Sequence, residues 1–192
     1  LVFTPTGAEV QGTFTRVNFE ALRREWPSLD TLFPLLPHLR GQVSGELEGR
    51  FPLQKGRILW PEAKAQLSLL CEKLIVVESP YTYQLFSIIP LTDFKRIEVG
   101  DVRVLLRLEE GVIRLDTAYL QANRWRIEVS GSHTIKGELS YTLLVEVPRV
   151  YLDKSPMRTR EWIQETEGEK VKLLVWVAGT GEAPRLRWKP AG

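Results

Sequence analysis

The chain has 192 residues, 43% of them hydrophobic, and its 26 Lys and Arg side chains nearly balance its 24 Asp and Glu side chains. That length suits a single domain, residues 1–192, which can bury a substantial core. A net charge of +2 with both signs interspersed excludes a concentrated basic surface, so no nucleic-acid partner is expected. Cys71, the one cysteine, permits no internal disulfide, and its apolar neighbours indicate a buried thiol.

The first forty residues predict one strand followed by short helices. Residues 8–17 alternate as a strand does, and Asn18 can cap a helix whose apolar residues recur at helical spacing. Pro27 ends that helix. A second helical turn is expected after Ser28, and nearby prolines keep it short. Both helices are amphipathic, so we expect them to lie against a sheet.

Residues 41–192 predict an antiparallel sheet. The expected strands span 43–51, 65–77, 96–109, 112–121, 124–135, 138–147, 170–178 and 184–188. The strand at 65–77 is apolar on both parities in places, which predicts that it is covered on both faces. A short amphipathic helix is expected at 80–89, with Ser79 at the cap and Pro80 at the first helical position.

Alternation from residue 102 onward separates an apolar face of this sheet from a charged one. The candidate groove-lining positions on the apolar face are Val102, Val104, Leu106, Ile113, Leu115, Ile127, Val129, Leu139, Tyr141 and Leu143. Their neighbours on the opposite face are mainly Arg, Glu, Ser and Thr, so we expect that face to be solvated. The alternation lapses between 149 and 167, where Trp162 and Ile163 are expected to anchor a helical turn.

No pattern of catalytic or metal-binding residues stands out, so no enzyme activity, metal site or cofactor is expected. The chain lacks the nucleophile elbow, the zinc-protease helix and the phosphate-binding loop. His38 lies between a proline and a leucine in a turn, and His133 at a strand end is expected to bond turn backbone. Glu109 and Glu110 precede Gly111, which indicates solvated turn residues.

Residues 129–148 combine strict alternation with a short motif. Ser-Gly-Ser-His stands at 130–133, a glycine turn follows at 136–137, and Tyr-x-Leu-x-Val-x-Val occupies 141–147. This order resembles the C-terminal region of the AsmA family of bacterial envelope proteins, which are relatives of TamB-type proteins. Further fragments in the same order extend the resemblance over about residues 41–192.

The resemblance implies a mainly β (α+β) fold: a long, twisted antiparallel meander curled into a trough, with two or three short amphipathic helices on or at the end of its apolar face. A strand of ten residues spans about 33 Å, so such a trough can hold an extended acyl chain. The family is associated with outer-membrane assembly and lipid traffic. The resemblance therefore implies phospholipid acyl chains and envelope proteins as partners and a periplasmic location. It also implies an inner-membrane tether in a longer protein, of which this chain is expected to be a fragment.

Three functions follow as alternatives. The first is non-enzymatic transport of phospholipid between membranes through an apolar β-groove. The second is a structural end cap or protein-interaction module whose helices fill the apolar face. The third is a carbohydrate-binding sandwich, which an exposed aromatic cluster on a polar sheet would favour, whereas a continuous apolar groove would favour lipid.

Overall fold

The computed structural model describes residues 2–4, 7–88, 96–122, 124–151 and 168–191, with only the backbone of 2–4, 85–88 and 151. The strands are β1 (Val2–Thr4), β2 (Gly7–Asn18), β3 (Leu39–Gln54), β4 (Arg57–Ile58), β5 (Lys64–Val77), β6 (Arg96–Glu109), β7 (Val112–Ala122), β8 (Trp125–Thr134), β9 (Glu138–Pro148), β10 (Lys170–Thr180) and β11 (Pro184–Pro190). The helices are α1 (Phe19–Glu25), α2 (Leu29–Leu32) and α3 (Pro80–Ile88), with 3-10 turns η1 (Leu36–His38), η2 (Trp60–Glu62) and η3 (Arg149–Tyr151). The helical turn expected near Trp162 lies outside the described residues.

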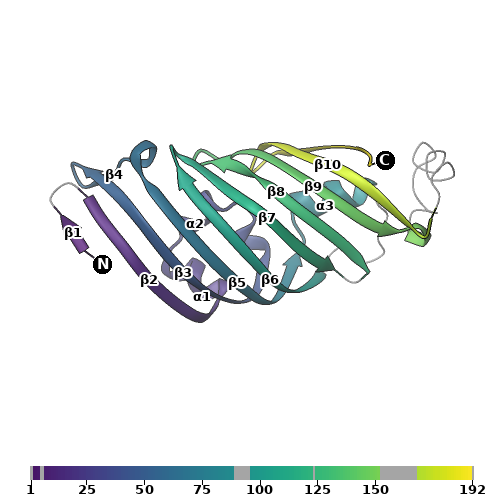
Figure 1. The fold of residues 1–192 in the computed structure, drawn as a ribbon, viewed down its shortest axis with the longest axis horizontal. Coiled ribbons are helices and arrows are strands. Elements are labelled where there is room, and N and C mark those ends of the chain that lie inside the picture. Colours follow the sequence, from purple (N-terminus) through teal and green to yellow (C-terminus); the bar gives the residue numbers. More distant parts are fainter. Residues whose placement is uncertain (1, 5–6, 89–95, 123, 152–167, 192) are drawn as a thin grey trace.

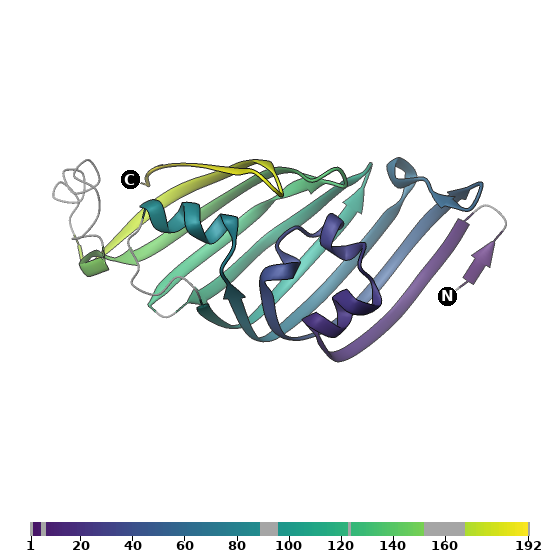
Figure 2. The same cartoon turned by 180° about the vertical axis from the view of Figure 1, so that it is seen from behind.

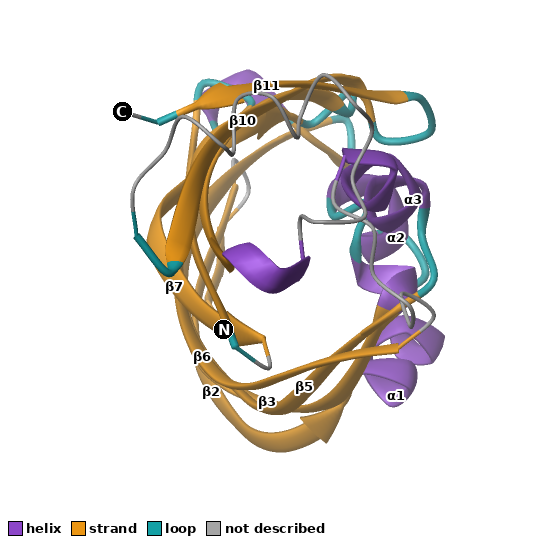
Figure 3. Cartoon of the chain, turned by 90° about the vertical axis from the view of Figure 1, so that its right-hand side faces the viewer, coloured by secondary structure: helices purple, strands orange, loops and turns teal. Residues whose placement is uncertain are grey.

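All strands in the described residues belong to one open antiparallel sheet, in the order β1-β2-β3-β5-β6-β7-β8-β9-β10-β11, with β4 paired to β3 (Figure 1). Apart from the short β4, each strand pairs with the strands before and after it in the chain, as in a meander. Viewed from its end, the sheet is strongly curled, and the helices lie at its open side (Figure 3). The predicted fold class, a mainly β trough with short helices, is therefore confirmed. We call the concave, helix-bearing side the inner face and the convex side the outer face.

The strand predictions hold with small shifts at the ends, except that β1 and β4 were not predicted and β3 is longer than expected. β3 covers Leu39–Gln54 because it pairs with β2, β4 and β5 over different parts of its length. The caps follow the sequence in part. Asn18 Oδ1 accepts from the Glu20 backbone N–H at 2.7 Å, and Ser79 Oγ accepts from that of Thr82 at 3.1 Å. Ser28 occupies the cap position of α2, but its side chain makes no capping hydrogen bond.

The prediction that residues 65–77 are covered on both faces is wrong. On the outer face of β5, Ser68 is exposed and Leu70 is 37% exposed. The apolar residues change parity because a bulge interrupts the pairing between Cys71 and Leu74. Lys73 in the bulge has φ 52°, and its backbone N–H donates to Asp101 Oδ1 of β6 at 2.9 Å. Cys71 and Leu74 consequently both belong to the buried cluster on the inner face.

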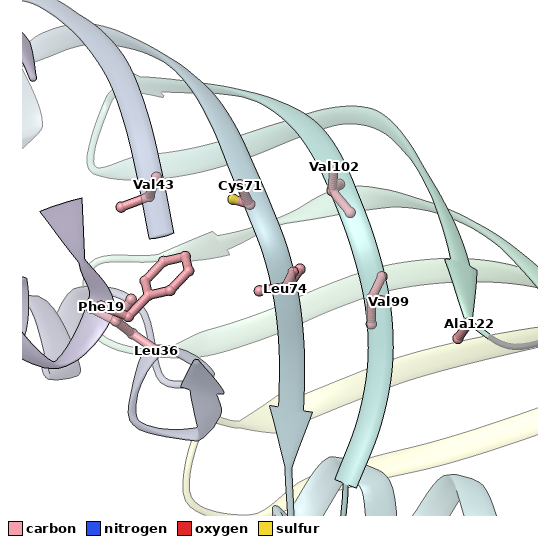
Figure 4. Close-up of a cluster of buried hydrophobic side chains, with 8 residues drawn as sticks. All are labelled: Phe19, Leu36, Val43, Cys71, Leu74, Val99, Val102 and Ala122. Carbon is pink, nitrogen blue, oxygen red and sulfur yellow. The ribbon is translucent and has the colours of Figure 1, made fainter. Parts of the chain in front are cut away.

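Two buried clusters lie on the inner face. The N-terminal cluster consists of Phe19, Leu36, Val43, Cys71, Leu74, Val99, Val102 and Ala122 (Figure 4). The C-terminal cluster consists of Trp125, Val145, Val147, Val171, Leu173 and Val175. Phe19 of α1 and Leu36 of η1 cover the first cluster, whereas α3 crosses the C-terminal strands that carry the second (Figure 2).

Candidate functional site

The cross-strand register places all ten candidate groove residues on the inner face. Directly opposed residues of neighbouring strands project to the same side of a sheet. Leu106 lies opposite Leu115, and from there the register passes through Gly131 to Tyr141. By the same rule, a second row runs from β6 to β9 through Leu108, Ile113, His133 and Leu139. A third row runs from β7 to β9 through Ala118, Val129 and Leu143, and Ile127 of β8 lies opposite Val145 of β9. The residues that the alternation of the sequence assigns to one face therefore do share one face of the sheet.

Accessibility divides the ten into two groups. Val102, Ile113 and Leu139 are buried, with 2%, 4% and 8% of their surface exposed. The seven that are half-buried are Val104, Leu106, Leu115, Ile127, Val129, Tyr141 and Leu143. Of these, Val104 packs against the N-terminal cluster, and Ile127 and Leu143 pack against the C-terminal cluster.

The candidate surface also includes residues that the sequence prediction did not list. Leu47 of β3 lies opposite Leu67 of β5, which lies opposite Leu106 of β6, which lies opposite Leu115 of β7. All four are half-buried, and we call them the leucine row. With strands about 4.8 Å apart, the row runs roughly 14 Å across four strands. The helices leave the parts of β3 and β5 nearest β4 uncovered (Figure 2).

Aromatic side chains extend this apolar surface toward β4. Phe51 lies on the inner face of β3, two positions past Gly49, and its ring meets that of Trp60 edge to face with centroids 6.4 Å apart. Ile58 of β4 is 37% exposed. The alternation in residues 43–51 would have identified Leu47 and Phe51, because they share the parity of Val43.

The pairing of β6 with β7 ends where the leucine row crosses them. Residues Leu106–Glu109 pair with Val112–Leu115, and β7 then carries a bulge between Leu115 and Ala118. In the described parts of both strands no further β6–β7 pair follows. On the inner face, Val102 of β6 and Ala122 of β7 nevertheless pack in the N-terminal cluster. Apolar contacts therefore hold the two halves of the sheet together there in place of a regular hydrogen-bond ladder.

The outer face is polar and carries two shallow hollows, of about 670 and 510 Å³. Arg103 and Asp116 are among the residues that line the first, and Arg126 and Glu146 are among those that line the second. Tyr119, which is 65% exposed, borders the second hollow, and Trp176 is 38% exposed on β10. Strands β8 and β9 separate these two aromatic side chains, so they do not form the cluster that would favour sugar binding.

His133 has a different partner from the expected turn backbone. It is 5% exposed, and its Nε2 lies 2.5 Å from the carbonyl oxygen of Leu32, which is 101 residues away in α2. Since a carbonyl only accepts, Nε2 carries the proton, and Nδ1 accepts from the Tyr141 hydroxyl at 2.7 Å. Burial lowers the pKa of His133 and raises the pKa of Tyr141. The sequence could not show this bond because nothing local marks the distant helix.

The remaining polar candidates have structural roles. His38 Nδ1 lies 2.7 Å from the carbonyl oxygen of Glu78, which connects η1 to the end of β5. Glu109 forms a 2.8 Å ion pair with Lys64, which lowers the pKa of the carboxyl, and Glu110 is exposed in the turn. Burial raises the pKa of the Cys71 thiol to about 11, so the thiol is protonated at neutral pH.

Neither a metal centre nor a membrane-spanning helix is found in the described part of the chain. No three His, Cys, Asp or Glu side chains gather there in a way that could hold a metal ion. None of the described helices has the length and apolar character needed to cross a membrane. The candidate site described above is an apolar surface on the concave side of the sheet.

Comparisons with family models, curated proteins and solved structures gave no match for this chain. The relation to the AsmA family accordingly stays a prediction from the sequence motifs.

Proposed function

We propose that this domain is a non-enzymatic relative of the AsmA family that binds phospholipid acyl chains along its inner face and shields them during transfer between membranes. The leucine row carries the proposal, because four directly opposed leucines remain half-buried on the concave side of an open sheet. The proposal includes a periplasmic location, envelope proteins as partners, and a tether to the inner membrane in the full-length protein.

The chemistry of the row suits an acyl chain. Apolar surface removed from water contributes about 25 cal/mol per Å², without directional requirements. An acyl chain offers only such contacts, and the row supplies leucine side chains on four successive strands. Leu108 and Ala65, opposite each other on β6 and β5, widen the surface on one side, whereas Val104 and Leu69 on the other side pack against the N-terminal cluster. Contiguous apolar surface of this kind commonly marks an interaction site.

A structural module with a filled core is the second candidate, and the two buried clusters favour it. Val145, Val147 and Leu173 have no exposed surface at all, so much of the inner face is already occupied by the protein itself. Under this alternative the leucine row is the margin of a core, and another protein, in place of lipid, covers it in the full assembly.

Substitutions of two adjacent leucines in β6 can distinguish lipid binding from a purely structural role. Leu105 and Leu106 are both half-buried, but Leu105 lies opposite Ser68 on the outer face and Leu106 lies opposite Leu67 on the inner face. Native mass spectrometry after bacterial expression should detect phospholipid bound to the wild-type protein and to Leu105→Glu. Leu106→Glu should lose the lipid, because a carboxylate in the groove opposes an acyl chain.

Circular dichroism and thermal unfolding must show that Leu106→Glu is folded. If it is not, Leu47→Gln, an uncharged change in the same row, replaces it. A wild-type protein that carries no lipid and takes up no added fluorescent phospholipid would contradict the proposal and favour the structural module. Equal loss of lipid from Leu105→Glu would show that binding does not depend on the inner face.

A further inference from the structure

The segment between β2 and β3 crosses the open side of the trough and has two differently attached ends. We call residues 18–39, which contain α1, α2 and η1, the lid. Its root is apolar: Phe19 and Leu36 are 3% and 7% exposed and pack on Val43 and Cys71 of the neighbouring strands (Figure 4). An ion pair of 2.9 Å between Arg40 and Glu20 adds to this attachment. The root is therefore fixed by apolar packing to β3 and β5.

The tip of the lid, from α2 to Pro34, reaches strands far away in the sequence. α2 has no buried residue. Leu29 and Phe33 pack, partly buried, against the N-terminal cluster. Toward the C-terminal strands, the Leu32 carbonyl contacts His133, and the Phe33 ring meets the His133 ring edge-on with centroids 5.9 Å apart. Pro34 also lies so close to Gly181, in the β10–β11 turn, that a Cβ there would come within 2.5 Å of its ring. On the C-terminal strands the tip is thus held by one buried hydrogen bond and a few close contacts.

The pair of hydrogen bonds at His133 depends on the neutral ring, although Nε2–H can donate to the Leu32 carbonyl in either form. Nε2–H donates to Leu32, and Nδ1 accepts from the Tyr141 hydroxyl. A second ring proton, on Nδ1, would point at the hydrogen of the Tyr141 hydroxyl, and the hydroxyl would have to turn away. The added proton would also create a positive charge in a buried position. The polar groups that contact His133 are the Leu32 carbonyl of α2 and the Tyr141 hydroxyl of β9. Tyr81 of α3 contributes to the raised pKa of Tyr141, after the larger effect of burial. Tyr81 itself donates to the Gly181 carbonyl at 3.1 Å.

The tip also lies where the leucine row would continue. In the register, Leu115 is followed by Gly131 of β8 and then by Tyr141 of β9. Tyr141 is the residue that supports His133. Removing the tip would therefore extend the accessible apolar surface from β7 toward β8 and β9.

We infer that the tip of the lid is a proton-sensitive gate, closed over neutral His133 and released about its apolar root when His133 is protonated, which opens the C-terminal part of the groove to an acyl chain. This inference rests on the proposed lipid-binding function. The direction follows from linkage: burial lowers the pKa of His133 in the closed state, so the closed state binds fewer protons than the open one. Closure is complete above the ordinary histidine pKa of about 6.5 and weakens as the pH falls below it.

The gate can be tested without lipid by a distance measurement between spin labels. Thr31 on α2 and Lys136 in the β8–β9 turn are exposed and can carry labels as cysteine substitutions in a Cys71→Ala background. A second pair, on Glu48 of β3 and Lys136, reports on the sheet itself. From about pH 7.5 to about pH 5, the first pair should gain a longer-distance population and the second should not change.

Two variants connect this opening to His133. His133→Gln can still donate to the Leu32 carbonyl but has no titration in this range, so its distances should stay short at both pH values. Tyr141→Phe keeps the ring and removes the hydroxyl that Nδ1 accepts from, so opening should begin at higher pH. Unchanged distances in the parent protein would overturn the gate, and so would opening of His133→Gln at low pH with the sheet pair constant. If His133→Gln does not fold, the Tyr141→Phe result decides in its place, and a pH profile identical to the parent overturns the gate.

Lipid uptake is then measured on the same proteins with a fluorescent phospholipid. Faster uptake at about pH 5 than at about pH 7.5, absent in His133→Gln, supports a gate on the groove. If the tip opens but no lipid binds at either pH, the movement of the tip is supported, but its role in lipid access and the proposed function are both overturned. Lipid binding with a tip that never opens would retain the proposed function and overturn the gate alone.

Discussion

The covered and uncovered parts of the inner face are made of the same kinds of residue on the same strands, yet one is core and the other is surface. On β6, Val102 is 2% exposed, whereas Leu106, four residues later on the same face, is half-buried. The difference comes from what lies above them. Phe19 and Leu36 of the lid belong to the same packed cluster as Val102, while the four leucines of the row belong to neither buried cluster. Alternation thus decides which face a side chain occupies, and the segments between strands decide whether it is buried.

The largest expected effect contrasts a covered with an uncovered leucine. Leu173 of β10 has no exposed surface, so Leu173→Ala should lower the free energy of unfolding by about 3 kcal/mol. Leu106→Ala should lower it by only about 1 kcal/mol, because the half-buried side chain leaves no closed cavity. Chemical denaturation of both variants measures the difference. Equal losses would show that the leucine row is as tightly packed as the core.

Two inner-face glycines provide a second contrast. A Cβ on Gly45 of β3 would lie 2.7 Å from the Ser68 carbonyl oxygen and 2.7 Å from Leu69 Cδ2, so Gly45→Ala should destabilise the fold by about 2 kcal/mol. A Cβ on Gly12 of β2 would meet no atom within 4 Å, so Gly12→Ala should be neutral or stabilise by up to about 1 kcal/mol. Thermal unfolding measures both, and a destabilising Gly12→Ala would mean that this end of the face is not open.

The smallest effect concerns the lid alone. Arg23 of α1 donates through two nitrogens to Asp30 of α2, each at 2.7 Å, and this pairing lowers the pKa of the Asp30 carboxyl. Asp30→Asn should cost about 1 kcal/mol at neutral pH, since the pair is partly buried and bidentate. The contribution is present above the ordinary Asp pKa of about 3.9 and is lost as the pH falls through the lowered value. A stability difference between parent and variant that does not shrink toward about pH 3 would contradict this assignment.

Most of the sheet could be predicted from the sequence because its signals are local. Period-two alternation placed Val104, Leu106, Leu115 and Leu143 on one face, and glycines marked the hairpin turns. The short helices were also predictable, since Asn18 and Pro27 mark the beginning and end of the first one. The covering of residues 65–77 was mispredicted because a single bulge at Lys73 changes the parity of the strand, and no residue type announces a bulge there.

The candidate site was predictable only in part. Which side chains share a face follows from parity, but the burial of Val102 depends on α1, and the role of His133 depends on Leu32, 101 residues earlier. Such long-range contacts have no signature in a single sequence. Leu47 and Leu67 differ from these residues because their signal is local: Leu47 shares the alternation of residues 43–51, and Leu67 alternates with Leu69 and Cys71.

The order of the strands has a consequence for the way the protein folds. The strands pair with their neighbours along the chain, except that β3 also pairs with β5 across the short β4. The sheet can therefore grow one hairpin at a time from contacts of short sequence separation, which favours rapid folding. The bonds from Leu32 to His133 and from Tyr81 to Gly181 join residues 101 and 100 positions apart. They can form only after the hairpins that carry them have assembled. We therefore expect the docking of the lid tip to be the last step of folding and the first contact to be lost when the protein begins to unfold.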